Sequence, residues 1–505
     1  MSLILRRVGI DTYHENIAYL PAGSELAKSQ GFNALSKVEV HSGTRSILAT
    51  LNMTENGLVK QGEIGLSNIA FQRLGVDEGS PIRLSHPNPL LSFEFVRQKL
   101  EGRFIEKSAF LSIMRDIVGH RYSNIELTAF VIAGYKQDFS VEEIIALTEA
   151  MIETGERIDW GLPLVLDKHC VGGIPGNRST MIVVPIIAAL GLPMPKTSSR
   201  AITSPSGTAD TMETLSEVRL SLEEMREVVA AEHACIAWGG SVALAPADDI
   251  LISVERPLNL DSEGQMIASI LAKKRAAGSN RMVLDIPIGP TAKVESSEQA
   301  ERLKRLFQEV GRRIGLQIHP VFSEGLQPCG RGIGPALEAR DVLQVLQGLP
   351  GHPEDLREKS LFLAGELLEF SGHVTSGRGL GLARETLESG QAWEKFQRIA
   401  WRQGGLREPR IAKHSAPVTS SISGVVEAIH NQKIASSAKL AGAPHDPGAG
   451  VFLEAKVGDR VEAGAPLFRI YAENPEELRF SLDYVAANED IFRIRSARDV
   501  ESKKS

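Results

Sequence analysis

The chain has 505 residues, a formal net charge of −7, 42% apolar residues and 24% charged residues. It is too long for one hydrophobic core, which predicts roughly two to four domains, and its acidic balance argues against broad nucleic-acid binding. It has no apolar run that could span a bilayer, no secretory leader pattern, and three dispersed cysteines without metal-binding spacing. We therefore expect a cytoplasmic protein with no membrane or nucleic-acid partner and no metal.

Residues 1–90 alternate short apolar stretches with turn residues. SKVEVHSGTRSILATLNM (36–53) and SPIRLSH (80–86) are typical of strands, whereas NGLVKQGEIGLS (56–67) is typical of turn-rich connections. This pattern predicts a β-barrel-like domain at the N-terminus.

Residues 91–157 change to a helical period. Two capping boxes, Ser123 with Glu126 and Ser140 with Glu143, precede apolar residues at helical spacing. We expect a helical lobe here.

Residues 158–412 alternate between strands and helices. LPLVLDKH (162–169) and RMVLDIPIG (281–289) are predicted to be buried strands. Helices are predicted at residues 179–191, 221–240 and 298–315, each ending on glycine. Such alternation predicts an α/β lobe with a mostly parallel sheet, to which a helix within residues 255–280 adds one wall of a cleft.

Residues 413–500 return to a β pattern. GVFLEAKVGDRVEAGAPLFRIYA (450–472) is similar to lipoyl- or biotinyl-carrier barrels, but no exposed hairpin carries a convincing lysine for modification. We expect a structural module of the α/β-hammerhead or barrel-sandwich kind. The fold class predicted for the whole chain is multidomain α/β, with a helical lobe and a β module at each end.

A glycine-rich turn follows the first predicted α/β strand. In DKHCVGGIPGN (167–177), Lys168 and His169 precede three glycines that permit positive φ, and Ser179 and Thr180 then begin a helix. Helix N-terminal amides, a glycine-rich turn and one lysine together favour an anion. A tight strand-to-helix turn with a surface lysine is the structural alternative, and the spacing fits neither a Walker A loop nor a dinucleotide fingerprint.

A second cluster follows the next predicted strand. KTSSRAITSPSGTADTMETL (196–215) carries many hydroxyls and Arg200, which suit phosphate or sugar oxygens, although a polar surface loop would look similar. Because the carboxyl ends of parallel strands share one crevice, we expect both clusters to open on the same site.

A third cluster lies in NLDSEGQMIASILAKKRAAG (259–278). Ser269 and Lys273 are four residues apart and share one face of a predicted helix that Asp261 or Ser262 caps. A solvated helix face is the alternative for such a stripe.

These motifs, together with ALAPADD (243–249), closely resemble the thymidine/pyrimidine nucleoside phosphorylase family over nearly the whole chain. The resemblance is strongest to the longer branch, which includes AMP phosphorylases and bacterial proteins classed as thymidine phosphorylases. It implies a homodimer or higher homo-oligomer, a helical lobe closing on an α/β lobe, and reversible phosphorolysis of thymidine to thymine and 2-deoxy-D-ribose 1-phosphate. Inorganic phosphate is then a co-substrate, and no cofactor is implied.

The resemblance also implies roles for individual residues. Phosphate-binding positions are matched by Lys168, Ser198 and Thr208, with Thr180 as a fourth. Nucleoside- or nucleotide-contacting positions are matched by Gly173, Ser199, Arg200, Ala201, Ile202, Thr203, Ser204, Ser269, Lys273 and Lys293. Two proton donors are implied with comparable weight: Asp261, as in the AMP branch, and His169, as in the thymidine enzymes.

Three departures from the shorter pyrimidine enzymes keep alternatives open. Cys170 replaces a phosphate-binding serine, the glycine turn is one residue longer, and Val254 replaces a base-binding arginine. The lost arginine keeps an AMP phosphorylase acting on nucleoside 5′-monophosphates as the main alternative. A Mg²⁺-dependent phosphoribosyltransferase of the anthranilate type, a non-catalytic nucleotide-binding protein and a glycoside hydrolase are the remaining alternatives.

Overall fold

The computed structural model of the chain describes residues 2–13, 15–55, 57–201, 204–258, 260 and 262–496. The chain divides into two compact units, Met1–Gln137 and Asp138–Ser505. Within the described ranges, every helix is too short or too polar to traverse a lipid bilayer.

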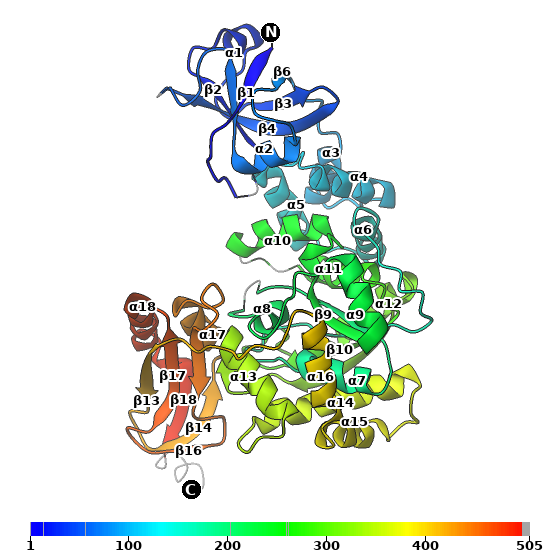
Figure 1. Cartoon of the computed structure of the whole chain (residues 1–505), viewed down its shortest axis with the longest axis vertical. Helices are drawn as coiled ribbons and strands as arrows, with labels where there is room; N and C mark the ends of the chain where they lie inside the picture. Colours follow the sequence, from blue (N-terminus) through cyan, green and yellow to red (C-terminus); the bar gives the residue numbers. More distant parts are fainter. Residues whose placement is uncertain are drawn as a thin grey trace. The chain divides into compact units, whose positions relative to one another are not determined.

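The first unit begins with a closed barrel whose strands run in the order β1-β5-β2-β4-β3-β6 (Figure 1). The strands are β1 (Leu3–Arg7), β2 (Ile17–Pro21), β3 (Lys37–Ser42), β4 (Arg45–Thr54), β5 (Glu63–Leu66) and β6 (Pro81–Ser85). Alternating apolar side chains such as Leu5, Leu51 and Ile64 fill the interior. Two short helices, α1 (Glu25–Gln30) and α2 (Asn68–Leu74), accompany the strands.

β5 corrects one expectation, because it lies inside the stretch 56–67 that was predicted to be only turn-rich connections. The strand is just four residues long, and glycines at Gly62 and Gly65 obscure its pattern. Gly65 packs closely against Val59 and Val8, so a glycine there reflects tight packing and not a turn.

Three helices complete the first unit, α3 (Phe93–Leu100), α4 (Lys107–Val118) and α5 (Asn124–Lys136). Both predicted capping boxes are confirmed: Ser123 and Glu126 begin α5, and Ser140 and Glu143 begin α6 (Val141–Glu153) at the start of the second unit. At both helices the glutamate accepts the amide of the capping serine, and at α6 Ser140 Oγ also accepts the Glu143 amide.

The α/β part of the second unit is built on parallel strands. One sheet has the order β11-β10-β7 and another pairs β8 with β9, all parallel, as the sequence predicts. The strands are β7 (Leu166–Cys170), β8 (Met194–Ser198), β9 (Ala234–Trp238), β10 (Arg281–Ile288) and β11 (Gln317–Glu324). The helices are α7 (Thr180–Ala189), α8 (Thr208–Glu213), α9 (Leu222–Glu232), α10 (Pro246–Leu258), α11 (Glu263–Ala276), α12 (Ser297–Arg313), α13 (Pro335–Leu346), α14 (Glu354–Ser371), α15 (Gly379–Glu388) and α16 (Gln391–Arg402).

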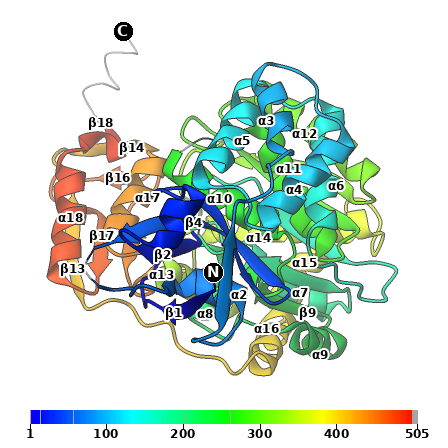
Figure 2. The same ribbon diagram turned by 90° about the horizontal axis from the view of Figure 1, so that it is seen from above.

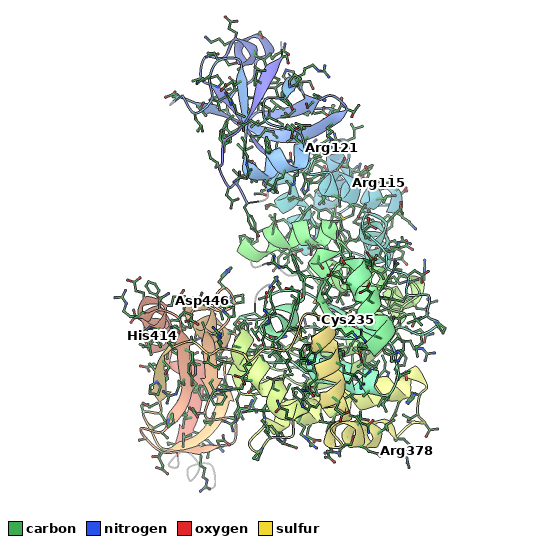
Figure 3. The ribbon with its side chains drawn as sticks, in the orientation of Figure 1. Arg115, Arg121, Cys235, Arg378, His414 and Asp446 are labelled. Carbon is green, nitrogen blue, oxygen red and sulfur yellow. The ribbon has the colours of Figure 1, made fainter. Side chains whose placement is uncertain are left out.

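The predicted helix at residues 221–240 is wrong in its second half. α9 ends at Glu232, His233 takes a left-handed conformation with φ of 64°, and β9 begins at Ala234. Cys235, labelled in Figure 3, is fully buried on this strand, which pairs with β8. The run ACIAW is apolar on both faces, so periodicity alone does not separate a buried strand from a buried helix.

The C-terminal module contains two sheets, β12-β15-β17-β13 and β16-β14-β18. Its elements are β12 (Gly332–Ile333), β13 (His414–Thr419), β14 (Gly424–Ile429), α17 (Asn431–Leu440), β15 (Gly450–Leu453), β16 (Arg460–Val461), β17 (Pro466–Ala472), α18 (Pro475–Ala486) and β18 (Phe492–Ser496). Figure 2 shows α18 lying along β17 and β13. Because β12 comes from the α/β part, the module and the α/β part share a sheet.

Candidate active site

β7 separates two groups of side chains, because successive residues of a strand point to opposite faces. Lys168 and Cys170 face the start of α7, where their partners Ser179 and Asn177 lie. Asp167 lies on the other face, where it contacts Lys196 and, together with His169, belongs to a different polar cluster. One strand end therefore serves two adjoining sites.

Lys168 is the centre of the first site. Its side chain is 1% exposed, and Nζ donates to Ser179 Oγ at 2.8 Å and to Thr180 Oγ1 at 3.4 Å. Among the described residues no carboxylate pairs directly with it, and burial lowers its pKa. A buried ammonium held by neutral hydroxyls at a helix N-terminus is a favourable place for an anion.

Neighbouring charges do not cancel that of Lys168. Asp285 lies opposite Cys170 on β10, but its carboxylate is paired with Lys359 at 3.0 Å and accepts a bond from Ser323 at 2.5 Å. The side-chain amide of Asn177 spans from Asp285 to Cys170 Sγ. Asp285 therefore balances only part of the positive charge that Lys168 and Lys359 carry together.

The hydroxyl-rich segment reaches this site through a residue that the sequence reasoning missed. Arg178, directly before Ser179, donates to Ser206 O at 2.7 Å and to Thr208 Oγ1 at 3.3 Å. The same guanidinium is ion-paired with Glu338. The structure thus brings Lys168 and Thr208 to one side of the strand ends, as the two clusters predict. The sequence signal that could have identified Arg178 is its position directly before the helix that follows the glycine turn.

Ser198 ends β8 with a buried hydroxyl that has no hydrogen-bond partner within the described part of the chain. Buried polar groups are nearly always paired, and an exception calls for a ligand, a water or a function. Its place at the carboxyl end of a parallel strand is where an α/β sheet binds ligands.

The second polar cluster was also missed. The Asp167 carboxylate accepts bonds from Lys196 at 2.7 Å and is paired with Lys274 at 3.1 Å. Although burial raises it, the two ammonium groups hold the pKa of Asp167 below its usual value. Burial, then the charges of Lys274 and Lys196, holds the pKa of His169 well below its usual value. His169 is therefore neutral near pH 7.

The Arg200 side chain is engaged by neighbouring residues of the same region. Its guanidinium pairs with Asp210 at 3.0 Å and with Glu213 at 2.5 Å, and it stacks over Trp238 at 4.9 Å. The Glu213 hydrogen bond in particular raises the pKa of Arg200. Asp210 also accepts the Ala201 amide at 2.6 Å, so the loop is tied to the start of α8.

The structure describes only some of the other predicted residues of this loop. The Ser199 carbonyl accepts the Ala209 amide at 3.4 Å, and Ser204 Oγ donates to Ser206 O at 2.8 Å. Ile202 and Thr203 lie outside the described residues. A substrate contact from this loop stays a prediction.

The stripe on α11 is confirmed as one cluster, with a partner that the sequence reasoning did not assign. Ser269 Oγ donates to Asp248 Oδ2 at 2.8 Å, and Lys273 Nζ reaches Asp248 at 2.8 Å and Asp249 at 2.9 Å. Although burial lowers it, these carboxylates raise the pKa of Lys273. Asp261, the second predicted proton donor, lies outside the described residues.

Gly173 and Lys293 are brought together from distant parts of the sequence. Gly173 has φ of +86°, and a Cβ there would clash with the backbone nitrogen of Lys293. Both residues were predicted to contact the nucleotide, and their adjacency places the β10–α12 loop against the glycine turn.

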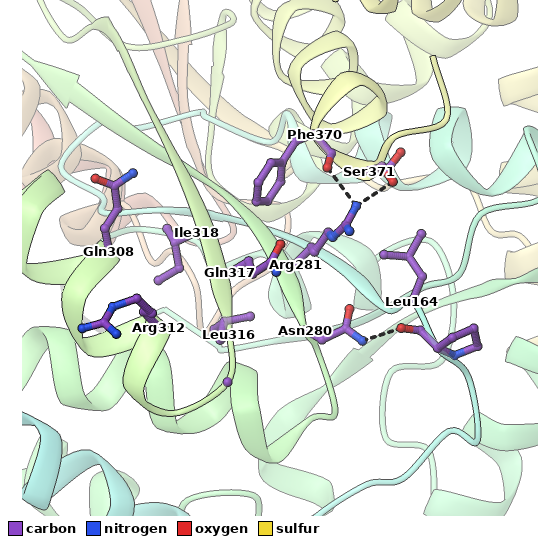
Figure 4. A pocket seen from close by; sticks show the side chains of 12 residues that line it. Leu164, Asn280, Arg281, Gln308, Arg312, Leu316, Gln317, Ile318, Phe370 and Ser371 are labelled. Carbon is purple, nitrogen blue, oxygen red and sulfur yellow. Dashed lines mark hydrogen bonds between the residues drawn. The ribbon is translucent and has the colours of Figure 1, made fainter. Parts of the chain in front are cut away.

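A separate pocket lies at the opposite edge of the sheet (Figure 4). Its lining includes Leu164, Arg281 and Gln317, which stand at or just before the amino ends of β7, β10 and β11. Arg281 donates to the carbonyls of Phe370 and Ser371 at 3.1 and 2.7 Å. The predicted site residues are all absent from this lining. Nowhere in the described ranges do three or more histidine, cysteine or acidic side chains gather in a metal-binding group.

Family models match three parts of the chain. The glycosyl transferase family matches by its helical bundle domain at residues 93–155 and by its a/b domain at residues 162–393. The pyrimidine nucleoside phosphorylase C-terminal domain matches residues 425–491. A helical bundle with an α/β domain whose strand ends hold a buried lysine and hydroxyls thus defines a glycosyl-transferring enzyme of the pentosyltransferase class.

The chain is similar over almost all its length to bacterial relatives. A protein of Polaromonas sp. strain JS666 named "Putative thymidine phosphorylase" is 51% identical, with 97% of this chain and 96% of that protein covered. Proteins with the same printed name from Legionella pneumophila strain Paris and Hahella chejuensis are 50% and 49% identical, each covering 97% of this chain and 95% and 97% of the relative. The chain belongs to the thymidine/pyrimidine nucleoside phosphorylase family.

A solved structure of anthranilate phosphoribosyltransferase from Thermus thermophilus also matches, with a TM-score of 0.49 and 21% identity. The match covers 61% of this chain and 99% of that one.

Proposed function

We propose that the protein catalyses the reversible phosphorolysis of thymidine. An oxygen of inorganic phosphate bonds to C1′ of the nucleoside as the C1′–N bond to the base breaks. The bonding electrons leave with the base, which takes up a proton. The products are thymine and 2-deoxy-D-ribose 1-phosphate.

The observation that carries this proposal is the buried Lys168 ammonium, which forms no direct ion pair with a carboxylate among the described residues. Its buried ammonium is held by Ser179 and Thr180, the Ser198 hydroxyl lacks a partner among the described residues, and Arg178 holds Thr208 toward the same strand ends. Bound phosphate would meet donors that need no reorganisation, and its charge would stabilise the positive sugar of the transition state.

Two residues are proposed for the leaving base. His169 is neutral near pH 7, so its contribution is a hydrogen bond from an imidazole N–H and not proton transfer from an imidazolium. Asp261 is the proposed proton donor, and Ser269 with Lys273 is proposed to contact the base. Asp248 holds both of these side chains on one face of α11.

Further properties follow from the same proposal. The enzyme acts as a homodimer or higher homo-oligomer in the cytoplasm, and it needs phosphate but no metal or organic cofactor. The C-terminal barrel-sandwich module is a structural support for the α/β part. Light scattering in solution and activity after EDTA treatment test the oligomer and the metal independence.

The deciding experiment incubates the protein with phosphate and thymidine, uridine, AMP or CMP and follows release of the base. Phosphate-dependent release of thymine from thymidine is the expected result. Release only from AMP or CMP would instead identify a nucleoside 5′-monophosphate phosphorylase. Consumption of 5-phosphoribosyl diphosphate with Mg²⁺, without phosphorolysis, would identify a phosphoribosyltransferase.

A further inference from the structure

The junction between the glycine turn and the hydroxyl-rich segment rests on a single buried guanidinium. Arg178 is 9% exposed, and its three nitrogens bond to two chain segments, residues 206–208 and Glu338. Nη1 donates to the Thr208 hydroxyl, Nη2 donates to the Ser206 carbonyl, and Nε donates to the Glu338 carboxylate. We propose that Arg178, oriented by Glu338, is the positioning residue that aims the Thr208 hydroxyl at the phosphate. This inference rests on the proposed phosphorolysis.

Arg178 is placed to act through Thr208, because each of its three nitrogens already donates to a protein group and one of these groups is the Thr208 hydroxyl. By donating to Thr208 Oγ1, it makes that hydroxyl an acceptor toward Arg178 and leaves its hydrogen free to point elsewhere. A phosphate oxygen accepts such a hydrogen. The planar guanidinium fixes these directions, whereas a lysine offers one rotatable ammonium at a single point.

Glu338 is the anchor that gives Arg178 one orientation. It is 1% exposed, its Oε2 also accepts from Thr211 Oγ1 at 3.0 Å, and its Oε1 accepts the Gly334 amide at 3.1 Å. Both oxygens of this carboxylate are therefore hydrogen-bonded, Oε2 to Arg178 and to Thr211 of α8 and Oε1 to the N-cap amide of its own helix, which lowers the freedom of the pair. A buried charge pair satisfied in this way is a rigid support.

The C-terminal module in turn holds the element that carries Glu338. Glu338 lies in the first turn of α13, whose Ala336 amide donates to Pro447 O at 2.9 Å. β12, just before that helix, pairs Ile333 with Val451 of β15. Figure 1 shows α13 between the α/β strands and the orange and red strands of the module. A chain of contacts thus connects the module to Thr208: the module contacts α13, Glu338 of α13 pairs with Arg178, and Arg178 donates to Thr208.

The test measures kcat and KM for thymidine phosphorolysis with Arg178→Lys, Arg178→Met and Glu338→Gln. We expect each variant to raise KM for phosphate about tenfold or more, since a charge-assisted hydrogen bond contributes about 1.5–3 kcal/mol. KM for thymidine should stay within about twofold of its original value. Arg178→Lys keeps the charge, so it should fold and still show the phosphate defect.

Thr208→Val, introduced into the unmodified enzyme and into Arg178→Lys, tests whether Arg178 acts through Thr208. This substitution should raise KM for phosphate in the unmodified enzyme but add little in Arg178→Lys, because interacting residues are not additive. Arg281→Lys is the matched control: it loses bonds to the carbonyls of Phe370 and Ser371 at the far edge of the sheet, and its KM for phosphate should not change (Figure 4).

Two outcomes would overturn the inference: an unchanged KM for phosphate in folded Arg178→Lys, or fully additive effects of Arg178→Lys and Thr208→Val. If the unmodified protein releases no base from any nucleoside, the proposed function itself fails. In that case the inference is tested with inorganic phosphate alone, by measuring how much added phosphate raises the unfolding temperature. This rise should be present in the unmodified protein and in Arg281→Lys and smaller in Arg178→Lys, and an equal rise in all three would overturn it.

Discussion

The Lys196 ammonium lies 2.7 Å from Asp167 Oδ1 in the interior beside His169. Lys274 reaches the other oxygen of the same carboxylate at 3.1 Å, so two buried lysines share one carboxylate, and burial lowers the pKa of Lys196 to about 7. Lys196 also donates to the carbonyl of Lys168 at 2.8 Å, and Lys274 donates to the carbonyl of Thr197 at 3.2 Å. Asp167 therefore ties α11 and β8 to the strand that carries both candidate sites.

Replacing Asp167 by asparagine should strongly destabilise the second unit. The two lysines would remain buried without their counter-charge, and breaking a buried pair in this way costs about 3–5 kcal/mol of unfolding free energy. Thermal and urea unfolding followed by circular dichroism measure the loss. Asp490→Asn, which removes an exposed pair with Lys433, is the control and should leave the unfolding midpoint unchanged. Equal effects of the two substitutions would contradict a structural role for Asp167.

The charge state of His169 gives a pH prediction. Because its pKa is held well below 6.5 in the folded protein, the imidazole should stay neutral from pH 8 down to 6.5. As the pH falls below 6.5, the unfolded chain binds a proton that the folded chain does not, so stability should decrease until the folded pKa is reached. Proton NMR of the imidazole, assigned by its loss in His169→Asn, measures the titration. A midpoint at or above 6.5 without phosphate would contradict the prediction, whereas added phosphate should raise the midpoint.

Much of the architecture could be predicted because local signals agree with the fold. The capping boxes at Ser123 and Ser140, the parallel strands and the glycine turn each have a direct physical signature. The strand β9 could not be separated from α9, because its boundary depends on the left-handed His233 and on pairing with β8. A short apolar run does not indicate which distant strand it will pair with.

The candidate site could be predicted where its polar and charged residues are clustered in short segments of the sequence. The convergence of Lys168 and Thr208 follows from two clusters after neighbouring strands. Arg178 and Lys274 were missed because basic residues usually lie on the surface. Their roles depend on partners such as Glu338, which is far away in sequence and identifiable only from the folded chain.

Ser198→Ala should separate binding from stability. Its buried hydroxyl has no partner within the described residues, so removing it relieves a desolvation cost of about 1–3 kcal/mol. The unfolding temperature should therefore stay the same or increase, while KM for phosphate rises about tenfold because a donor is lost. Thr211→Val is the contrasting variant, since its hydroxyl is bonded to Ser206 and Glu338 and its loss should lower stability. A destabilised Ser198→Ala protein would show that the hydroxyl has a structural partner.

Gly172 and Gly173 form a matched pair for the glycine turn. Both have positive φ, 107° and 86°, so alanine strains the backbone at either position. A Cβ at Gly172 would meet open space, whereas a Cβ at Gly173 would displace Lys293. Gly173→Ala should therefore lower kcat/KM for thymidine at least about tenfold more than Gly172→Ala. Equal losses in the two variants would mean that backbone strain alone, and not the contact with Lys293, explains the effect.

Asn431 ties the C-terminal module to the loop that precedes Lys293. Its fully buried side-chain amide donates to Thr291 Oγ1 at 3.1 Å and to Gly325 O at 3.0 Å, two residues before Lys293 and at the neighbouring turn. Asn431→Ala should free the β10–α12 loop and raise KM for thymidine about fivefold to tenfold with little change in KM for phosphate.

Asn474→Ala is the control for Asn431→Ala, because Asn474 caps α18 of the same module by accepting the Glu477 amide at 2.9 Å. Loss of this cap should lower stability by about 1 kcal/mol without changing either KM. Steady-state kinetics with each substrate varied, together with thermal unfolding, distinguish the two variants. If Asn431→Ala lowers stability as Asn474→Ala does and leaves KM for thymidine unchanged, the module supports the fold alone and not the nucleoside side of the site.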